Sequence, residues 1–307
     1  MRFYTQQHQF YCGIDWHART MSLCIVNQDG AILVHRNMPA GPEPFLKAVA
    51  PSREDVVVCV ACLFPWDWLA DLCAREGMPF VLGHALSMKA IHGGKAKNDT
   101  IDSQNMAVLL RGGMLPQASV SPAAMRATRD VLRRRMPLMR KRAELLAHMQ
   151  HTHSQYHLPG MGKNIAYKAN RDGIAERFPA PAVQQSLAVD LALIGHDDHL
   201  VNDVEFSIVH TAQQHDPQTL SRRPSVPGIG TILRLVLLDD IHPIDRLPRV
   251  HDVVSSCRLV TCAKESAGKR SGTSGATIGH ASLQWAFSEA AGLLRRTHPA
   301  GQKSLAR

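Results

Sequence analysis

The sequence predicts an α/β domain with a mixed sheet, then a long helical middle part and a mostly helical C-terminal domain. Strand and helix patterns alternate over the first hundred residues, two long helical patterns follow, and a further apolar run begins after a Pro-Gly turn. We place the three parts at residues 8–118, 119–217 and 218–307. A chain of 307 residues is long enough for more than one domain.

Short strands and helices alternate in the first part. The segment over residues 56–62 is apolar throughout, which is typical of a strand buried on both faces. An Asn-Gln-Asp-Gly stretch separates two earlier strand patterns and predicts a turn between them. We expect strands over residues 10–15, 22–27, 31–36, 56–62 and 79–82, and helices after Gly41-Pro42 and over residues 65–76.

Two long helical patterns dominate the middle part. The first begins at Ser121 and runs to about Tyr156, with Pro137 as the expected place for a kink. The second ends at about Gln214. We expect these helices to pack as an antiparallel, coiled-coil-like pair.

A Pro-Gly turn opens the last part, where Ser-Val-Pro-Gly-Ile-Gly over residues 225–230 precedes an apolar run. Helix-hairpin-helix modules hold a phosphate on the backbone N–H groups that such a turn exposes, here at Gly228 and Gly230. An ordinary tight connection between two helices explains the same residues equally well, so both interpretations stay open.

A second glycine-rich stretch follows at residues 264–275. Its glycines and hydroxyls predict a loop that presents Lys269 and Arg270. The stretch does not match the phosphate-loop pattern of nucleotide hydrolases, so that activity is not expected. A helix over residues 281–296 is expected to close the chain.

The charge of the chain points to a polyanionic partner. The formal net charge is +9 and the pI is near 9.4, and nucleic acid is the commonest partner of such proteins. Basic residues also outnumber acids by eight to two on the first long helix, although a solvated helix face is the alternative explanation. The basic residues are Arg126, Arg129, Arg133, Arg134, Arg135, Arg140, Lys141 and Arg142.

Neither a membrane nor a zinc site is expected. No apolar run approaches the ~20 residues that a membrane span needs, and the N-terminus lacks the apolar core of a signal peptide. We therefore expect a cytoplasmic protein with reduced cysteines. Cys59 and Cys62 have the spacing of metal ligands, but they form a single pair in a predicted strand, where residues three apart face opposite sides.

Two acids, Asp99 and Asp102, stand three residues apart before an apolar run. Asp99 as a helix cap, with Asp102 at the positive end of the helix dipole, explains the pair without any function. Residues three apart also share a helix face, and two carboxylates so placed can hold Mg²⁺. Asp15 ends the first predicted strand, where an unpaired charge would be costly to bury. A bound cation would pair that charge, so Asp15 is the expected third ligand.

Six motifs, taken together and in this order, resemble one family. They are "GIDWH", "WLADLC", "GKAKNDTIDS", "LLRGGMLP", "VPGIG" and "SAGKRSGTSG". From about residue 10 to residue 300, the chain resembles the DEDD transposases of bacterial insertion sequences, family 110. The resemblance implies a RuvC-like, ribonuclease-H-type domain at the N-terminus and a C-terminal domain with a serine nucleophile.

The resemblance implies more about activity and partners. Members of the family bind Mg²⁺ with four acids, and their serine becomes transiently esterified to DNA at the element ends and the target. A structured RNA from the element guides the reaction, and subunits assemble as homo-oligomers, here a dimer or tetramer, whose active sites combine domains from different subunits. The protein would then act in the bacterial cytoplasm, on the nucleoid.

Matched to the family pattern, Asp15 is the first acid, Asp99 and Asp102 are the third and fourth, and Ser266 is the nucleophile. Ser271 and Ser274 are rival candidates for the nucleophile. The resemblance and the charge of Lys269 and Arg270 together favour a role for these two cations beside the reacting phosphate.

One position departs from the pattern, because Ala61 stands where the family has its second acid, a Glu. Asp67 follows nearby, but we expect it on the next helix and not as a substitute. Loss of one acid should weaken metal binding, since hard cations favour charged oxygen ligands. Together with the chain end at Arg307, this predicts an inactive or altered copy. The alternatives are a non-catalytic nucleic-acid-binding protein and a simple RuvC-like nuclease.

Overall fold

A computed structural model describes residues 2–62, 66–91, 98–159, 164–215, 226–274 and 279–305. The chain divides into two compact units, Met1–Ala123 and Ala124–Arg307, which are described separately below. From Ala124 onward, the residues predicted as middle and C-terminal domains fall together in the second unit. The domain boundaries expected after residues 118 and 217 stay predictions.

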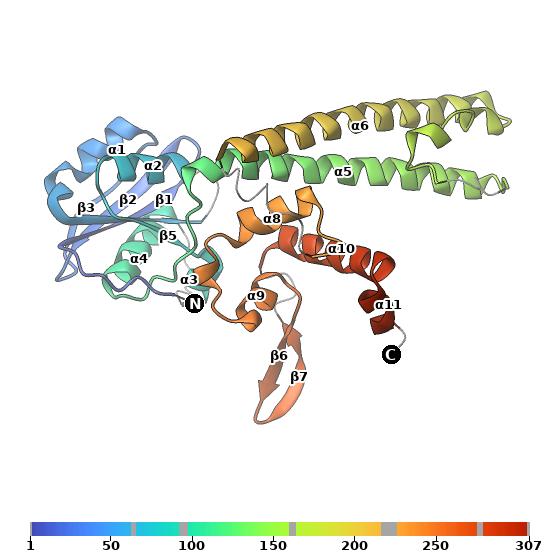
Figure 1. The fold of residues 1–307 in the computed structure, drawn as a ribbon. Helices are drawn as coiled ribbons and strands as arrows, with labels where there is room; N and C mark the ends of the chain where they lie inside the picture. Colours follow the sequence, from blue (N-terminus) through green and yellow to red (C-terminus); the bar gives the residue numbers. More distant parts are fainter. Residues whose placement is uncertain are drawn as a thin grey trace. The chain divides into compact units, whose positions relative to one another are not determined.

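A five-stranded mixed sheet forms the centre of the first unit (Figure 1). The first three strands make an antiparallel meander, and the first, fourth and fifth strands run parallel, in the order β3-β2-β1-β4-β5. The prediction of a mixed sheet is confirmed. The strands are β1 (Phe10–Trp16), β2 (Thr20–Asn27), β3 (Ile32–Pro39), β4 (Val56–Ala61) and β5 (Phe80–Gly83).

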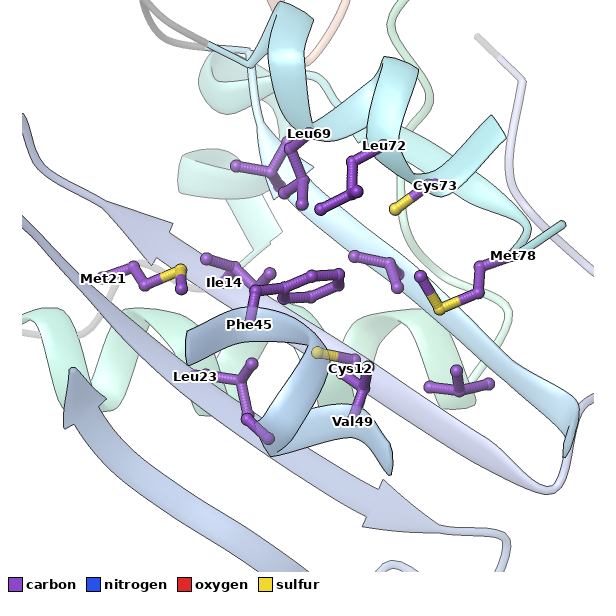
Figure 2. Close-up of a cluster of buried hydrophobic side chains, with 14 of the residues drawn as sticks. Cys12, Ile14, Met21, Leu23, Phe45, Val49, Leu69, Leu72, Cys73 and Met78 are labelled. Atoms are coloured by element: carbon purple, nitrogen blue, oxygen red, sulfur yellow. The ribbon is translucent and has the colours of Figure 1, made fainter. Parts of the chain in front are cut away.

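Helices cover both faces of this sheet because alternate residues of its central strands are apolar on each side. On one face, Phe45 and Leu69 pack against Ile14 (Figure 2). On the other face, Leu110 packs in a cluster with Tyr11. The first face carries α1 (Pro42–Val49) and α2 (Asp67–Arg75), the second carries α4 (Asp99–Arg111), and η1 (Ala50–Asp55) and α3 (Ala85–Ile91) complete the unit.

Two long helices, α5 (Ala123–Gln155) and α6 (Pro181–His215), form an antiparallel pair (Figure 1). Ion pairs join them at Arg135–Glu205 and Arg142–Asp198, and an apolar cluster lies where Met149 packs with Leu187. Pro137 lies inside α5, which continues past it as a single helix. Two short 3₁₀ turns, η2 (Lys168–Asn170) and η3 (Ala175–Arg177), lie between the two helices in sequence. Although α5 and α6 are long, no helix among the described residues is apolar enough to cross a membrane.

The rest of the second unit is helical except for one β-hairpin. The hairpin extends away from α9 and α10 (Figure 1). The prediction that residues 281–296 close the chain is incomplete, since a short helix follows them. The elements are α8 (Thr231–Ile241), η4 (Ile244–Arg246), α9 (Val250–Ser256), β6 (Cys262–Ser266), β7 (Lys269–Ser274), α10 (Ala281–Thr297) and α11 (Pro299–Leu305).

The prediction of a loop over residues 264–275 is wrong for residues 264–274, which belong to this hairpin; Gly275 lies outside the described residues. The turn consists of Ala267 and Gly268, whose φ angles are 49° and 75°. Positive φ at both central residues is the geometry that two-residue hairpin turns need. The many glycines and hydroxyls therefore belong to two exposed strands and not to irregular backbone.

Candidate active site

Asp15 lies at the carboxyl end of β1, on the face of the sheet that α4 covers. Ile14 belongs to the core on the opposite face, so its neighbour Asp15 points toward α4. Only 9% of Asp15 is exposed. Burial raises the pKa of its carboxyl, and the charges of Asp102 and Asp99 raise it further, against a lowering by His17 and by the backbone N–H of Trp16. Asp15 is thus held in a place where negative charge is already concentrated.

Gly13 allows α4 to reach this place. A Cβ at Gly13 would lie 2.2 Å from the carbonyl oxygen of Ser103 and 2.5 Å from the backbone nitrogen of Ala107. The helix backbone therefore lies directly on the strand, as only a glycine permits. The hydroxyls of Ser22 and Ser103, 3.1 Å apart, join β2 to the same helix. This packing brings the first turn of α4 to Asp15.

The start of α4 differs from the prediction that Asp99 caps it. The cap is Asn98, whose side-chain oxygen accepts a hydrogen bond of 2.7 Å from the backbone N–H of Ile101. Asp99 and Asp102 both lie in the first turn, where the helix dipole favours negative charge. Because Asn98 does the capping, the carboxylate of Asp99 is available for other contacts.

Asp15, His17 and Asp99 come together at this edge of the sheet. The Nε2 atom of His17 lies 3.0 Å from Oδ2 of Asp99 and 3.7 Å from Oδ2 of Asp15. One donor atom of each residue lies within 4.8 Å of the others, and no other such group occurs in the described parts of the chain. Asp102 is not part of this group, although its charge acts on the carboxyl of Asp15.

These residues fit a divalent cation. Asp15 and Asp99 supply hard oxygen ligands. The pKa of Asp15 is raised mainly by burial and further by the charges of Asp102 and Asp99, and a bound cation would offset both. His17 adds a nitrogen. His17 is not among the site residues predicted from the sequence, although it stands two residues after Asp15, and residues two apart in an extended chain face the same side.

Ala61 lies where an additional carboxylate would join the group. The parallel register pairs Gly13 with Cys59 and Ile14 with Val60, and its continuation sets Ala61 beside Asp15. Ala61 packs against the core on the α4 side. Asp67 begins α2, whose apolar residues pack on the opposite face.

Ser266 lies at the end of the hairpin in the second unit. It is the last residue of β6, next to the turn, and pairs in register with Lys269. Glu265 pairs with Arg270 one step further from the turn. Every one of these side chains is exposed. The two other serines considered lie on β7, where Ser271 is exposed as well.

The basic residues of α5 fall into three groups. Arg135 donates a hydrogen bond of 2.6 Å to Glu205, and Arg142 donates one of 2.6 Å to Asp198. These two cations therefore help to join α5 to α6. Arg126 and Arg129 are half-buried. The exposed group consists of Arg133, Arg134, Arg140 and Lys141.

Gly228, in the Pro-Gly turn, packs against α10. Its φ is +88°, and a Cβ there would lie 2.8 Å from the carbonyl oxygen of Ala290 and 2.9 Å from the nitrogen of Leu294. This observation favours the helix–helix connection over the phosphate site. Gly230 caps α8 without close neighbours, and its contact with a phosphate stays a prediction.

As predicted for a strand, Cys59 is buried and Cys62 exposed.

Comparison with known families agrees with the motifs. Residues 12–158 match a model for DEDD-type transposases (IS110), and residues 223–306 match the model described as Transposase IS116/IS110/IS902 family. A comparison with curated proteins gave no match. The mixed α/β sheet fits a RuvC-like domain, and the DEDD-type match supports the use of a divalent metal. The chain therefore belongs to the IS110-type transposases and is a transposase/recombinase enzyme.

Proposed function

We propose that this transposase cleaves and exchanges the DNA strands of an insertion sequence through a transient phosphoserine linkage at Ser266. The observation that most supports it is the meeting of Asp15 and Asp99, which are far apart in sequence, in a chain of a DEDD-type family. The exposed Ser266, beside Lys269, is the second support.

In this proposal, Asp15, Asp99 and Asp102 hold Mg²⁺. When bound, the cation neutralises charge on a phosphodiester and stabilises the charge that grows as it is attacked. The protein contributes the fixed positions of the three acids, which the close contact of Gly13 with α4 maintains.

Ser266 supplies the nucleophile. Its Oγ forms a bond to phosphorus and gives up its proton, while the bond between phosphorus and one deoxyribose oxygen breaks and that oxygen takes a proton. The phosphodiester is thereby exchanged for a phosphoserine ester, and attack by a second DNA hydroxyl restores the serine. A serine hydroxyl needs activation for such an attack. The charges of Lys269 and Arg270 would stabilise the phosphate on the same hairpin.

The partners we propose are the element ends, the target DNA, a structured guide RNA and further copies of the chain, as a dimer or tetramer acting in the cytoplasm on nucleoid DNA. The exposed cations of α5 support the nucleic-acid contacts. Charge reversal at Arg140 and Lys141 should weaken DNA binding and lower its dependence on salt by about one unit of log–log slope per contact.

A second candidate function is nucleic-acid binding without catalysis, and Ala61 is the observation that favours it. The paired register of β1 and β4 ends at Ile14 and Val60, the residues before Asp15 and Ala61. This supports a position of Ala61 near Asp15, where the family pattern has a Glu. Hard cations take about six oxygen ligands, and the loss of a charged one weakens binding. Ala61→Glu would restore a carboxylate ligand on the α4 side of the sheet.

The test is a covalent-adduct assay with labelled element-end DNA, target DNA and the non-coding RNA flanking the gene. We expect a protein–DNA adduct on a denaturing gel, stronger in Ala61→Glu, lost in Ser266→Ala and kept in Ser271→Ala. Adduct formation that persists in Ser266→Ala would overturn the assignment of the nucleophile. DNA cleavage without an adduct would indicate a hydrolytic nuclease, and binding without cleavage in both forms at position 61 would indicate the non-catalytic protein.

A further inference from the structure

His17 is a nitrogen donor in a group that is otherwise acidic. We propose that His17 is a direct ligand of the cation, and that its imidazole makes this site prefer Mn²⁺ to Mg²⁺. The inference rests on the proposed metal site and replaces Mg²⁺ with Mn²⁺ as the ion that this chain prefers there.

The position of the ring supports this role. Nε2 faces Oδ2 of Asp99 at 3.0 Å and Oδ2 of Asp15 at 3.7 Å, so it lies beside both carboxylates at once. The His17 side chain is about half exposed, whereas that of Asp15 is nearly buried. Asp15 is thus fixed by the packing of β1 against α4, whereas the half-exposed side chains of Asp99 and His17 have room to adjust to an ion.

The chemistry of the two ions decides between them. Mg²⁺ requires near-ideal octahedral geometry and oxygen ligands, and it gives up its water reluctantly. Imidazole suits first-row transition ions, and Mn²⁺ is the one among them that carboxylates also suit. A set of Asp15, Asp99 and His17 therefore fits Mn²⁺ better than Mg²⁺.

Ala61 strengthens the argument. A Glu at this position would add an oxygen and a negative charge beside Asp15, and the set would approach the all-oxygen environment that Mg²⁺ favours. With Ala61 in its place, the nitrogen of His17 makes up a larger share of the ligands. We therefore expect the preference for Mn²⁺ to be greater in this chain than in Ala61→Glu.

The experiment measures metal binding to the metal-free full-length protein, without DNA. Free Mn²⁺ is followed by electron paramagnetic resonance, and Mg²⁺ is added as competitor. We expect wild type to bind Mn²⁺ about tenfold or more tightly than Mg²⁺, and His17→Ala to lose most of that ratio. His17→Asp, which offers oxygen instead of nitrogen, should keep binding metal but shift toward Mg²⁺. His151→Ala, on an exposed site of α5, is the matched control.

An unchanged Mn²⁺/Mg²⁺ ratio in folded His17→Ala and His17→Asp would overturn the inference and leave the proposed recombination intact. Normal ratios with no DNA adduct under either ion would instead count against the proposed function alone. If neither wild type nor Ala61→Glu binds either ion, the acid group is not a metal site, and the inference fails together with the proposed role of the acids. Circular dichroism verifies the fold of each variant.

Discussion

The two regions that hold the proposed chemistry differ in how the fold supports them. The acid group lies where β1 and α4 touch, with Asp15 nearly buried and the helix backbone against Gly13. Ser266 lies on an exposed two-stranded hairpin, one residue from its turn. The acids are thus positioned by dense packing, and the serine by the hydrogen bonds and turn of a single ribbon.

This difference teaches that the two regions should tolerate change differently. Adding even one methyl group to a closely packed interior changes the stability. Substitutions at exposed positions rarely change it by more than about 0.5 kcal/mol. Substitutions near the acids should therefore affect folding and function together. Substitutions at the hairpin should separate function from stability.

The largest effect is expected for Gly13→Ala. The added Cβ would meet two backbone atoms of α4, which cannot move as a side chain can, so we expect a loss of about 3 kcal/mol in the free energy of unfolding of the first unit. Urea unfolding followed by tryptophan fluorescence measures it. Three of the four tryptophans lie in the first unit, and Trp285→Phe removes the fourth.

Gly292→Ala is the control for this change. Gly292 lies inside α10 with nothing within 4 Å of an added Cβ. Gly292 belongs to the second unit, so its unfolding is followed by helical circular dichroism. We expect this variant to be about 1 kcal/mol more stable, because alanine is the better helix former. Equal stability of Gly13→Ala and wild type would show that the acid group does not depend on close packing.

A smaller effect is expected for Asp239→Asn, in the helices that flank the hairpin. Burial raises the pKa of Asp239 to about 7, with the charge of Asp240 adding to it and those of Arg129 and Arg133 opposing it. The folded state therefore binds a proton that the unfolded state has lost. The stability from this group is complete below the ordinary pKa of an aspartate and is lost as pH rises toward about 7.

Asparagine keeps the neutral form at every pH, so the advantage of Asp239→Asn over wild type should grow between about pH 5 and pH 8, to the order of 2 kcal/mol. Urea unfolding followed by helical circular dichroism measures this at both pH values. A constant difference between the two proteins would mean that Asp239 is ionised throughout and that its burial is compensated.

The smallest effect on stability is expected for Ser266→Ala. The side chain is exposed and belongs to the hairpin alone, so the free energy of unfolding should change by less than about 0.5 kcal/mol while the DNA adduct disappears. The same urea titration tests it. A clear loss of stability would contradict the contrast between the two regions, because it would give Ser266 a structural role.

Much of the fold could be predicted from the sequence because its local patterns are strong. The five strands, the long helices and the start of α4 near Asp99 follow from periodicity and turn residues. The hairpin escaped prediction because its strands are polar on both faces and lack the alternation that marks a half-buried strand. The cap of α4 is Asn98 and not Asp99. The sequence could not distinguish the two because asparagine and aspartate cap helices equally well.

The sequence by itself determined the alternation of strands and helices, the acids at positions 15, 99 and 102, and the membership of a transposase family. Only the tertiary structure decided that His17 joins Asp15 and Asp99, and that Arg135 and Arg142 pair with acids of α6. The physical reason is the distance along the chain between the residues that determine each feature. Backbone conformation depends on neighbours along the chain, whereas the partner of a charged side chain depends on which distant faces pack together.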